Sequence, residues 1–239
     1  MSQRFTLVRV SCVLTAFAAA SDATGAAAVG PAPAMETGIV LDRLSHEQLR
    51  QWRSIERLVN ASGPNGAQLY PTLRGLWEWA AHGGNAIYIE LSAPDCAAKA
   101  IVGEFVIERF DPEAARHIGV IRLCLANIDR CPRGGCGTRA DGFVPFAGLG
   151  KKERYAEVLG HELAHAAYDF ASPERARMVM ERVDTVSAQV VTHRAQRGNE
   201  PLDAALRQRL EERDALLVDL EAHADAIELL VWQELAKRR

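Results

Sequence analysis

One pentapeptide constrains this chain most, because it requires a helix and brings two imidazoles together. His161, Glu162 and His165 form the pattern H-E-x-x-H within the run YAEVLGHELAHAAYD, which has strong helix formers and no proline. Residues four apart lie one above the other on a helix face, so both imidazoles can bind one tetrahedral metal ion. Glu162 lies beside that face, where its carboxylate can reach a water bound to the metal. The pattern predicts a zinc site with hydrolytic chemistry; hydrogen-bonded core histidines are the alternative.

A catalytic zinc site needs three protein ligands and one open position, so a third ligand must come from another part of the chain. The best candidate is Glu221, in the segment EAHAD near the C-terminus. Glu221 and Asp225 are four residues apart and lie on one face of a predicted helix, with alanines between them that allow close approach of another helix. The alternative is that both are solvated charges on a helix rich in Glu, Asp and Arg.

The order and spacing of these two motifs resemble a known family. HELAH followed by EAHAD is similar to the gluzincin peptidases related to the prenyl-protein (CAAX) protease and its bacterial membrane-bound and periplasmic relatives. The resemblance covers these two motifs only. It implies that His161, His165 and Glu221 bind Zn²⁺, that Glu162 is the general base, and that Asp225 supports a ligating imidazole. It also implies a zincin-like domain and a peptide or protein substrate.

Composition and charge narrow the classes of partner. The 239 residues are 48% hydrophobic and 25% charged, which is typical of a globular domain with a sizeable core. The formal net charge of -3 and the lack of a Lys/Arg cluster disfavour nucleic acid as a partner. After the N-terminal leader, no segment reaches the roughly 18 apolar residues that cross a bilayer, so we expect no transmembrane segment in the mature chain.

The N-terminus is typical of an export signal. Arg4 and Arg9 precede a short apolar run over residues 10–20, which ends in three alanines. This pattern predicts a cleaved signal peptide over residues 1–20 and a periplasmic or secreted protein. An uncleaved apolar tail on a cytosolic protein is the alternative. Residues 21–38 are rich in Ala, Gly and Pro, and we expect a disordered linker there.

Cysteine usage agrees with export. Four cysteines remain after the leader, namely Cys96, Cys124, Cys131 and Cys136. An even number in an oxidising compartment indicates two disulfides, for which three pairings exist. The turn-forming residues 132–135 favour a Cys131–Cys136 bond, which leaves Cys96 with Cys124. A cysteine zinc site is the alternative, but a Cys-x-x-Cys pair is missing.

The hydrophobic periods predict one α+β domain over residues 39–239, mostly helical with a sheet of about three strands. The expected helices cover residues 45–59, 71–81, 151–170, 172–197 and 201–237; the expected strands cover 86–92, 101–110 and 117–126. A Gly-rich loop fills residues 129–150. We expect the strand over 117–126 to lie at the rim of the cleft and to bind an extended peptide by strand addition.

Two other functions fit the same residues. The chain could be a non-catalytic exported binding or scaffold protein with a structural or vestigial metal site. It could also be a zinc hydrolase of non-peptide amides or esters. Among the remaining histidines, we expect His193 at the surface and His223 outside the metal site, since it lies about 200° round the helix from Glu221.

Overall fold

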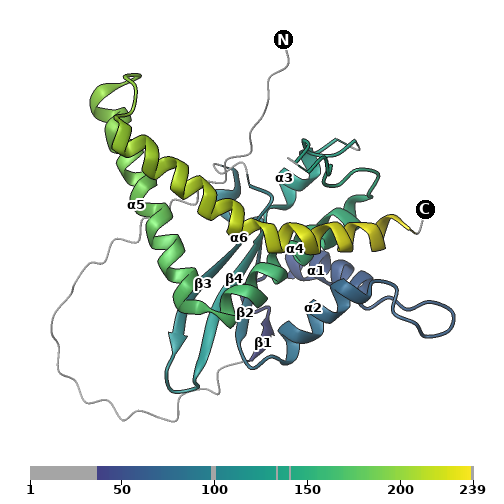
Figure 1. The fold of residues 1–239 in the computed structure, drawn as a ribbon. Helices are drawn as coiled ribbons and strands as arrows, with labels where there is room; N and C mark the ends of the chain where they lie inside the picture. Colours follow the sequence, from purple (N-terminus) through teal and green to yellow (C-terminus); the bar gives the residue numbers. More distant parts are fainter. Residues whose placement is uncertain (1–36, 98–100, 133, 140, 238–239) are drawn as a thin grey trace.

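The computed structural model describes residues 37–97, 101–132, 134–139 and 141–237. The predicted signal peptide and most of the predicted linker lie outside these residues. The chain is a mostly helical α+β fold with one sheet, as predicted (Figure 1). Its elements in chain order are β1 (Gly38–Val40), α1 (His46–Val59), α2 (Pro71–His82), β2 (Ala86–Leu91), the 3-10 helix η1 (Pro94–Ala97), β3 (Gly103–Asp111), β4 (Arg116–Leu123), α3 (Leu125–Arg130), α4 (Lys151–Ala171), α5 (Pro173–Arg197) and α6 (Ala204–Ala236).

The sheet has four strands in the order β1-β2-β4-β3. β1, β2 and β4 are parallel, and β3 pairs with β4 in the antiparallel sense. The prediction of three strands missed β1, which begins at Gly38 and has only three residues. β4 lies inside the sheet between β2 and β3, so the prediction that residues 117–126 form the rim strand is wrong. β3 is the edge strand on that side.

Most helix boundaries follow local sequence signals. α1 begins with a capping box, in which Ser45 and Gln48 each accept a hydrogen bond from the other's backbone N–H. α2 and α5 begin with Pro71 and Pro173, whose fixed φ and missing N–H suit the first helical turn. α3 was not predicted, because its apolar residues continue the run of β4 without a change in composition.

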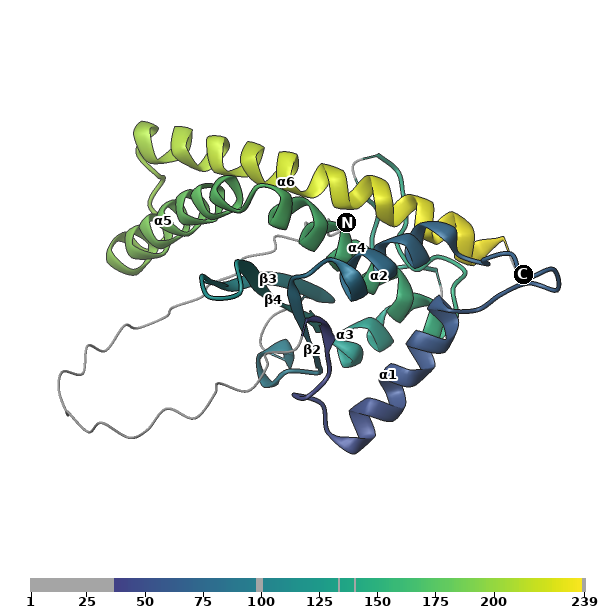
Figure 2. The ribbon, with the colours of Figure 1, turned by 90° about the horizontal axis from the view of Figure 1, so that it is seen from below.

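α4 is the central helix of the fold. It packs against β3 and β4 on one face of the sheet and against α1 and α2 beside it (Figure 2). The shared core of these elements includes the fully buried side chains of Trp52, Leu73, Ile89, Ile121 and Leu159. Because the middle of α4 is enclosed in this way, the polar side chains from Glu157 to His165 are removed from bulk water.

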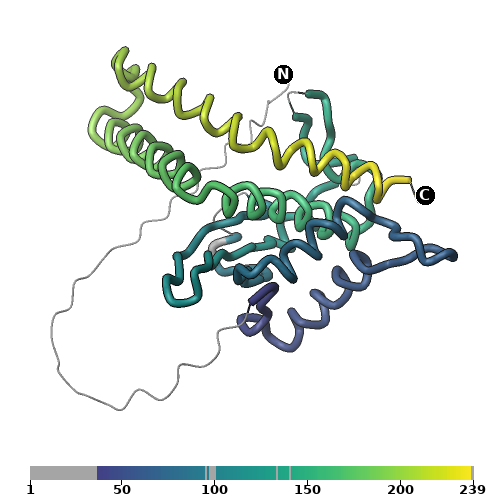
Figure 3. The backbone as a smooth tube through the Cα atoms, turned by 60° about the horizontal axis from the view of Figure 1, so that its bottom comes forward, coloured from purple at the N-terminus to yellow at the C-terminus, as the bar shows by residue number. Residues whose placement is uncertain are grey.

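α6 crosses α4 at close range. A Cβ atom added at Gly160 of α4 would lie 3.1 Å from Cγ2 of Val231 on α6. Ala164 on α4 and Ala224 on α6 are also fully buried. These three small residues allow the two helices to pack closely. α5 runs back along the first half of α6, and together they extend from the rest of the fold as a helical hairpin (Figure 3).

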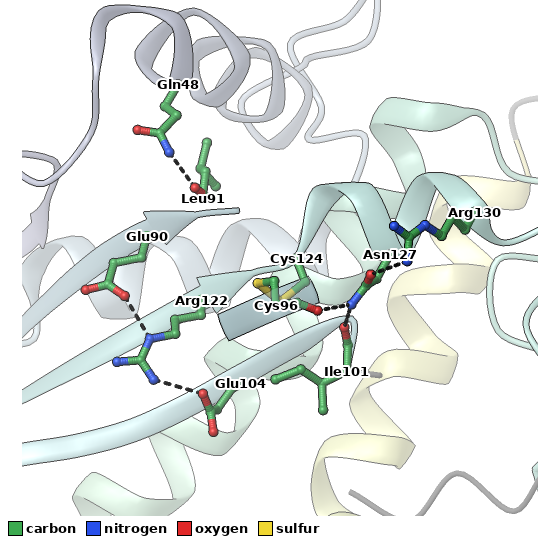
Figure 4. The surroundings of a disulfide bond; sticks show 10 residues. All are labelled: Gln48, Glu90, Leu91, Cys96, Ile101, Glu104, Arg122, Cys124, Asn127 and Arg130. Atoms are coloured by element: carbon green, nitrogen blue, oxygen red, sulfur yellow. Dashed lines mark hydrogen bonds and ion pairs between the residues drawn. A yellow bond between two sulfur atoms is a disulfide. The ribbon is translucent and has the colours of Figure 1, made fainter. Parts of the chain in front are cut away.

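Both predicted disulfides are present. Cys96–Cys124 joins η1 to the residue that follows β4, and Cys131–Cys136 closes a short loop after α3. Around the first bond, the side-chain amide of Asn127 donates to the carbonyl oxygens of Cys96 and Ile101, at 2.8 and 2.7 Å (Figure 4). The link therefore ties the ends of β3 and β4 to α3. Within the described residues, no helix is both long and apolar enough to cross a membrane.

Candidate metal centre

One face of α4 carries a stripe of four ionisable residues. Glu157, His161, His165 and Asp169 follow one another at intervals of four, so they lie in a row on the side that faces α6. His161 is only 3% exposed and His165 is 7% exposed. A buried polar stripe requires partners, and α6 supplies carboxylates opposite it.

The structure brings His161, His165 and Glu221 together. Nε2 of His161 lies 3.1 Å from Nε2 of His165. Oε2 of Glu221 lies 3.3 Å from the first nitrogen and 3.4 Å from the second. The three potential ligand atoms thus form a nearly equilateral triangle, although Glu221 is 56 residues from His165 in the sequence.

This triangle fits a zinc ion. Donor atoms about 2.0–2.1 Å from a tetrahedral zinc ion lie about 3.3–3.4 Å from one another, close to the observed separations. Two imidazole nitrogens and a carboxylate oxygen are also a known ligand set for catalytic zinc. Glu221 is partly exposed, whereas both imidazoles are buried, so Glu221 is the member of the triangle that borders solvent.

Glu162 lies next to the triangle and is 1% exposed. Neither of its carboxylate oxygens has a hydrogen-bond partner among the described residues. A Cβ atom added at Gly103, the first residue of β3, would lie 2.4 Å from Oε1 of Glu162. The absence of a side chain at Gly103 therefore makes the room that the Glu162 carboxylate occupies.

A second carboxylate pair lies on the Nδ1 side of His161. Oε2 of Glu228 is 3.5 Å from this nitrogen, and Oδ1 of Asp225 is 4.0 Å from it. Nη1 of Arg139 contacts both carboxylates, at 2.8 Å from Glu228 and 2.9 Å from Asp225. His161, Asp225 and Glu228 could also hold a cation by distance alone. Arg139 already contacts both of these carboxylates, and its positive charge would repel a cation bound between them, so the triangle with Glu221 is the better metal site.

Glu157 lies at the inner end of the stripe and is fully buried. Burial, together with the negative charge of Glu228, raises the pKa of its carboxyl to about 9. Its oxygens accept the backbone N–H of Phe146 at 3.3 and 3.2 Å. Glu157 is therefore a neutral acid at pH 7.

Asp169 lies at the outer end of the stripe, one turn beyond His165. Burial raises the pKa of its carboxyl to about 6, while the charge of His165 opposes the rise. Its Oδ1 is buried and without a hydrogen-bond partner in the described part of the chain. The two imidazoles thus lie between two acidic residues, Glu157 at one end of the stripe and Asp169 at the other.

His193 and His223 lie outside the triangle. The ring of His223 stacks on Tyr168, with 5.3 Å between ring centroids, and points away from Glu221 around the helix. His193 is partly buried near the end of α5. The antiparallel pairing of α5 and α6 puts it beside the start of α6, roughly 25 Å along the helix from Glu221.

Sequence reasoning missed four residues of this region: Gly103, Arg139, Glu157 and Glu228. Only Glu157 had a usable signal, because it precedes His161 by four residues and so had to share its helix face. Arg139 lies in a Gly-rich loop, and nothing local connects it to a helix that begins 65 residues later.

Comparison with protein-family models, with curated proteins and with solved structures found no match to this chain.

Proposed function

We propose that the chain is an exported zinc metallopeptidase. The observation that carries the proposal is the triangle of His161, His165 and Glu221, with the buried carboxylate of Glu162 beside it. A structural zinc site is normally closed by four protein ligands, whereas three ligands and an accessible side are typical of a catalytic one. The two disulfides support export, since such bonds persist in oxidising compartments.

Glu162 is the general base in this proposal. Zinc, when bound, supplies Lewis-acid chemistry, which polarises a carbonyl and acidifies water. Glu162 accepts the proton of the attacking water and then gives it to the leaving amine. Its burial suits this role, because a carboxylate without competing hydrogen bonds has its lone pairs available for the reacting water. His161, His165 and Glu221 would hold the ion, since each offers one donor atom.

The position of β3 supports a peptide as the substrate. β3 is the edge strand of the sheet, and its first residue, Gly103, touches Glu162. An extended peptide can pair with the outer edge of such a strand through main-chain hydrogen bonds. A peptide bound in this way would pass beside Glu162, with its carbonyl groups near the metal ligands.

Zinc content and hydrolysis in three proteins test the proposal. We expect the wild-type chain to contain one zinc ion and to cleave an unfolded protein in a chelator-sensitive reaction. Glu162→Gln should keep the zinc and lose hydrolysis, by about 10²–10⁴-fold for a general base. Glu221→Ala should lose the zinc on dialysis.

The outcomes separate the candidate functions. A wild-type chain that binds no zinc would refute the proposal and leave a binding or scaffold protein. Zinc binding with hydrolysis of small esters, but not of peptides, would indicate the non-peptide hydrolase. Wild-type peptide cleavage by Glu162→Gln would reassign the base.

A further inference from the structure

The loop between α3 and α4 contains Arg139, whose side chain contacts α6. Arg139 reaches α6, where Nη1 contacts the carboxylates of Asp225 and Glu228 at 2.9 and 2.8 Å. Both terminal nitrogens also donate to the backbone carbonyl of Asp225, each at 3.3 Å. One guanidinium therefore holds two side chains and one main-chain atom of α6. The same guanidinium also forms a fork with Asp141 of its own loop, with Nη2 2.7 Å from Oδ2 and Nε 3.4 Å from Oδ1. A planar group with several N–H donors makes all these contacts at once, which a lysine ammonium does not.

The loop itself is braced. The Cys131–Cys136 disulfide closes its base. The backbone N–H of Cys136 donates to the carbonyl of Pro145 at 3.1 Å, and that of Arg139 donates to Phe143 at 2.8 Å. Arg139 thus lies on one limb of a short, internally bonded hairpin. Its backbone has little freedom to follow α6, so the arginine can impose a position on the carboxylates.

The far side of the guanidinium is also fixed. Its central carbon lies 4.7 Å from the centre of the Phe143 ring. That ring packs edge-on against Trp232 of α6, with 5.6 Å between ring centroids. The indole N–H of Trp232 in turn donates to the carbonyl of Ala147 at 3.1 Å. Phe143 and Ala147 therefore add one aromatic and one polar contact with α6 to those that Arg139 makes.

Asp225 and Glu228 lie between Arg139 and a metal ligand. They approach Nδ1 of His161 at 4.0 and 3.5 Å, on the side of the ring opposite to the nitrogen that faces Glu221. A carboxylate on this side accepts the Nδ1 proton of a ligating histidine, fixes the tautomer and leaves Nε2 free to bind the ion. Two carboxylates at one imidazole repel each other unless a cation holds them together.

We propose that Arg139 is a positioning residue for the metal centre: it holds Asp225 and Glu228 against His161 and so fixes the orientation of that ligand. This inference rests on the proposed function. Without Arg139, the two carboxylates should separate, the imidazole should lose the negative charge held beside Nδ1, and the triangle of ligand atoms should widen. Loss of such outer partners typically reduces metal affinity by about 10- to 100-fold.

The zinc affinity of the full chain, measured by competition with a chromophoric chelator, tests the assignment. Arg139→Met should bind zinc about 10- to 100-fold more weakly, and Arg139→Lys should fall between it and the wild type. The matched control is Arg182→Met. Arg182 lies on α5 and pairs with Glu212 of α6, away from the site. This control variant should keep wild-type affinity. Circular dichroism and thermal melting of each variant report its folding.

The sign of the change separates positioning from simple electrostatics. Charge alone predicts tighter zinc binding in Arg139→Met, because a cation near a dication is removed. Unchanged or tighter binding therefore overturns the assignment. If Arg139 acts through the carboxylates, its substitution should have little further effect in an Asp225→Asn, Glu228→Gln background. A full effect there would also overturn it. Failure of the wild-type chain to bind zinc would instead refute the proposed function.

Discussion

Replacing Gly103 with alanine tests whether Glu162 works from the position observed in the structure. The new Cβ atom would lie 2.4 Å from Oε1 and 3.0 Å from Cδ of Glu162, and 2.6 Å from Cγ1 of Val158. Ordinary contact begins at about 3.4 Å, so the carboxylate must retreat by about 1 Å. Its terminal atoms can do this by rotation, and the chain should still fold. A displacement of about 1 Å in a catalytic group can cost about 10²-fold in rate.

The assay compares zinc content and hydrolysis in Gly103→Ala and wild type. We expect wild-type zinc content, because none of the three metal ligands touches the new methyl group closely, and about 100-fold slower cleavage of an unfolded protein. Gly75→Ala on α2 is the matched control, since its Cβ would meet no atom within 4 Å. Cleavage at the wild-type rate, or loss of zinc as in Glu221→Ala, would refute the reasoning.

Three further predictions concern stability. The folded-state pKa of Glu157, about 9, is above its ordinary value of 4.5, so stability from this group is complete at low pH and falls as pH rises between these values. The test is denaturant unfolding in the presence of a chelator. The unfolding free energy of Glu157→Gln minus that of wild type should grow by about 1.4 kcal/mol per pH unit from about pH 5 to 8. An equal dependence of both free energies on pH would contradict this. Replacing Cys96 and Cys124 with serine should lower the unfolding free energy by about 3–4 kcal/mol, given their sequence separation of 28; an unchanged midpoint would count against the chain-entropy argument. Zinc at 100 times its Kd should add about 2.7 kcal/mol to wild-type stability and raise its Tm, whereas Glu221→Ala should show no zinc-dependent shift.

The sequence predicted the parts of the site that depend on local periodicity. The pattern of His161, Glu162 and His165 requires a helix, and the helix is α4. The four-residue spacing of Glu221 and Asp225 correctly put both on one helix face. The structure places Glu221 in the triangle, but it brings Glu228 nearer than Asp225 to Nδ1 of His161. Glu228 could not be singled out from the sequence because α6 contains many acidic residues. Only the packing of α6 against α4 shows which of these residues face His161.

Strand order and loop docking were beyond local reasoning. Three of the strands have clear β patterns, but which of them lies at the edge depends on pairing between distant segments. β4 pairs with β2 in the parallel sense and with β3 in the antiparallel sense, so it became interior. Arg139 had no signal because its partners on α6 are 86 and 89 residues away. The short β1 has too few residues to show a period.

Gly160 and Val231 are two residues without ionisable groups at which α4 and α6 approach each other closely. Gly160 immediately precedes His161, and Val231 lies on the same helix as Glu221. A methyl group at position 160 would lie 3.1 Å from Val231, so that side chain or its helix would have to shift by a few tenths of an ångström. A substitution at either position would therefore change the distance between the helix that carries the two imidazoles and the helix that carries the carboxylate, without altering any ionisable group.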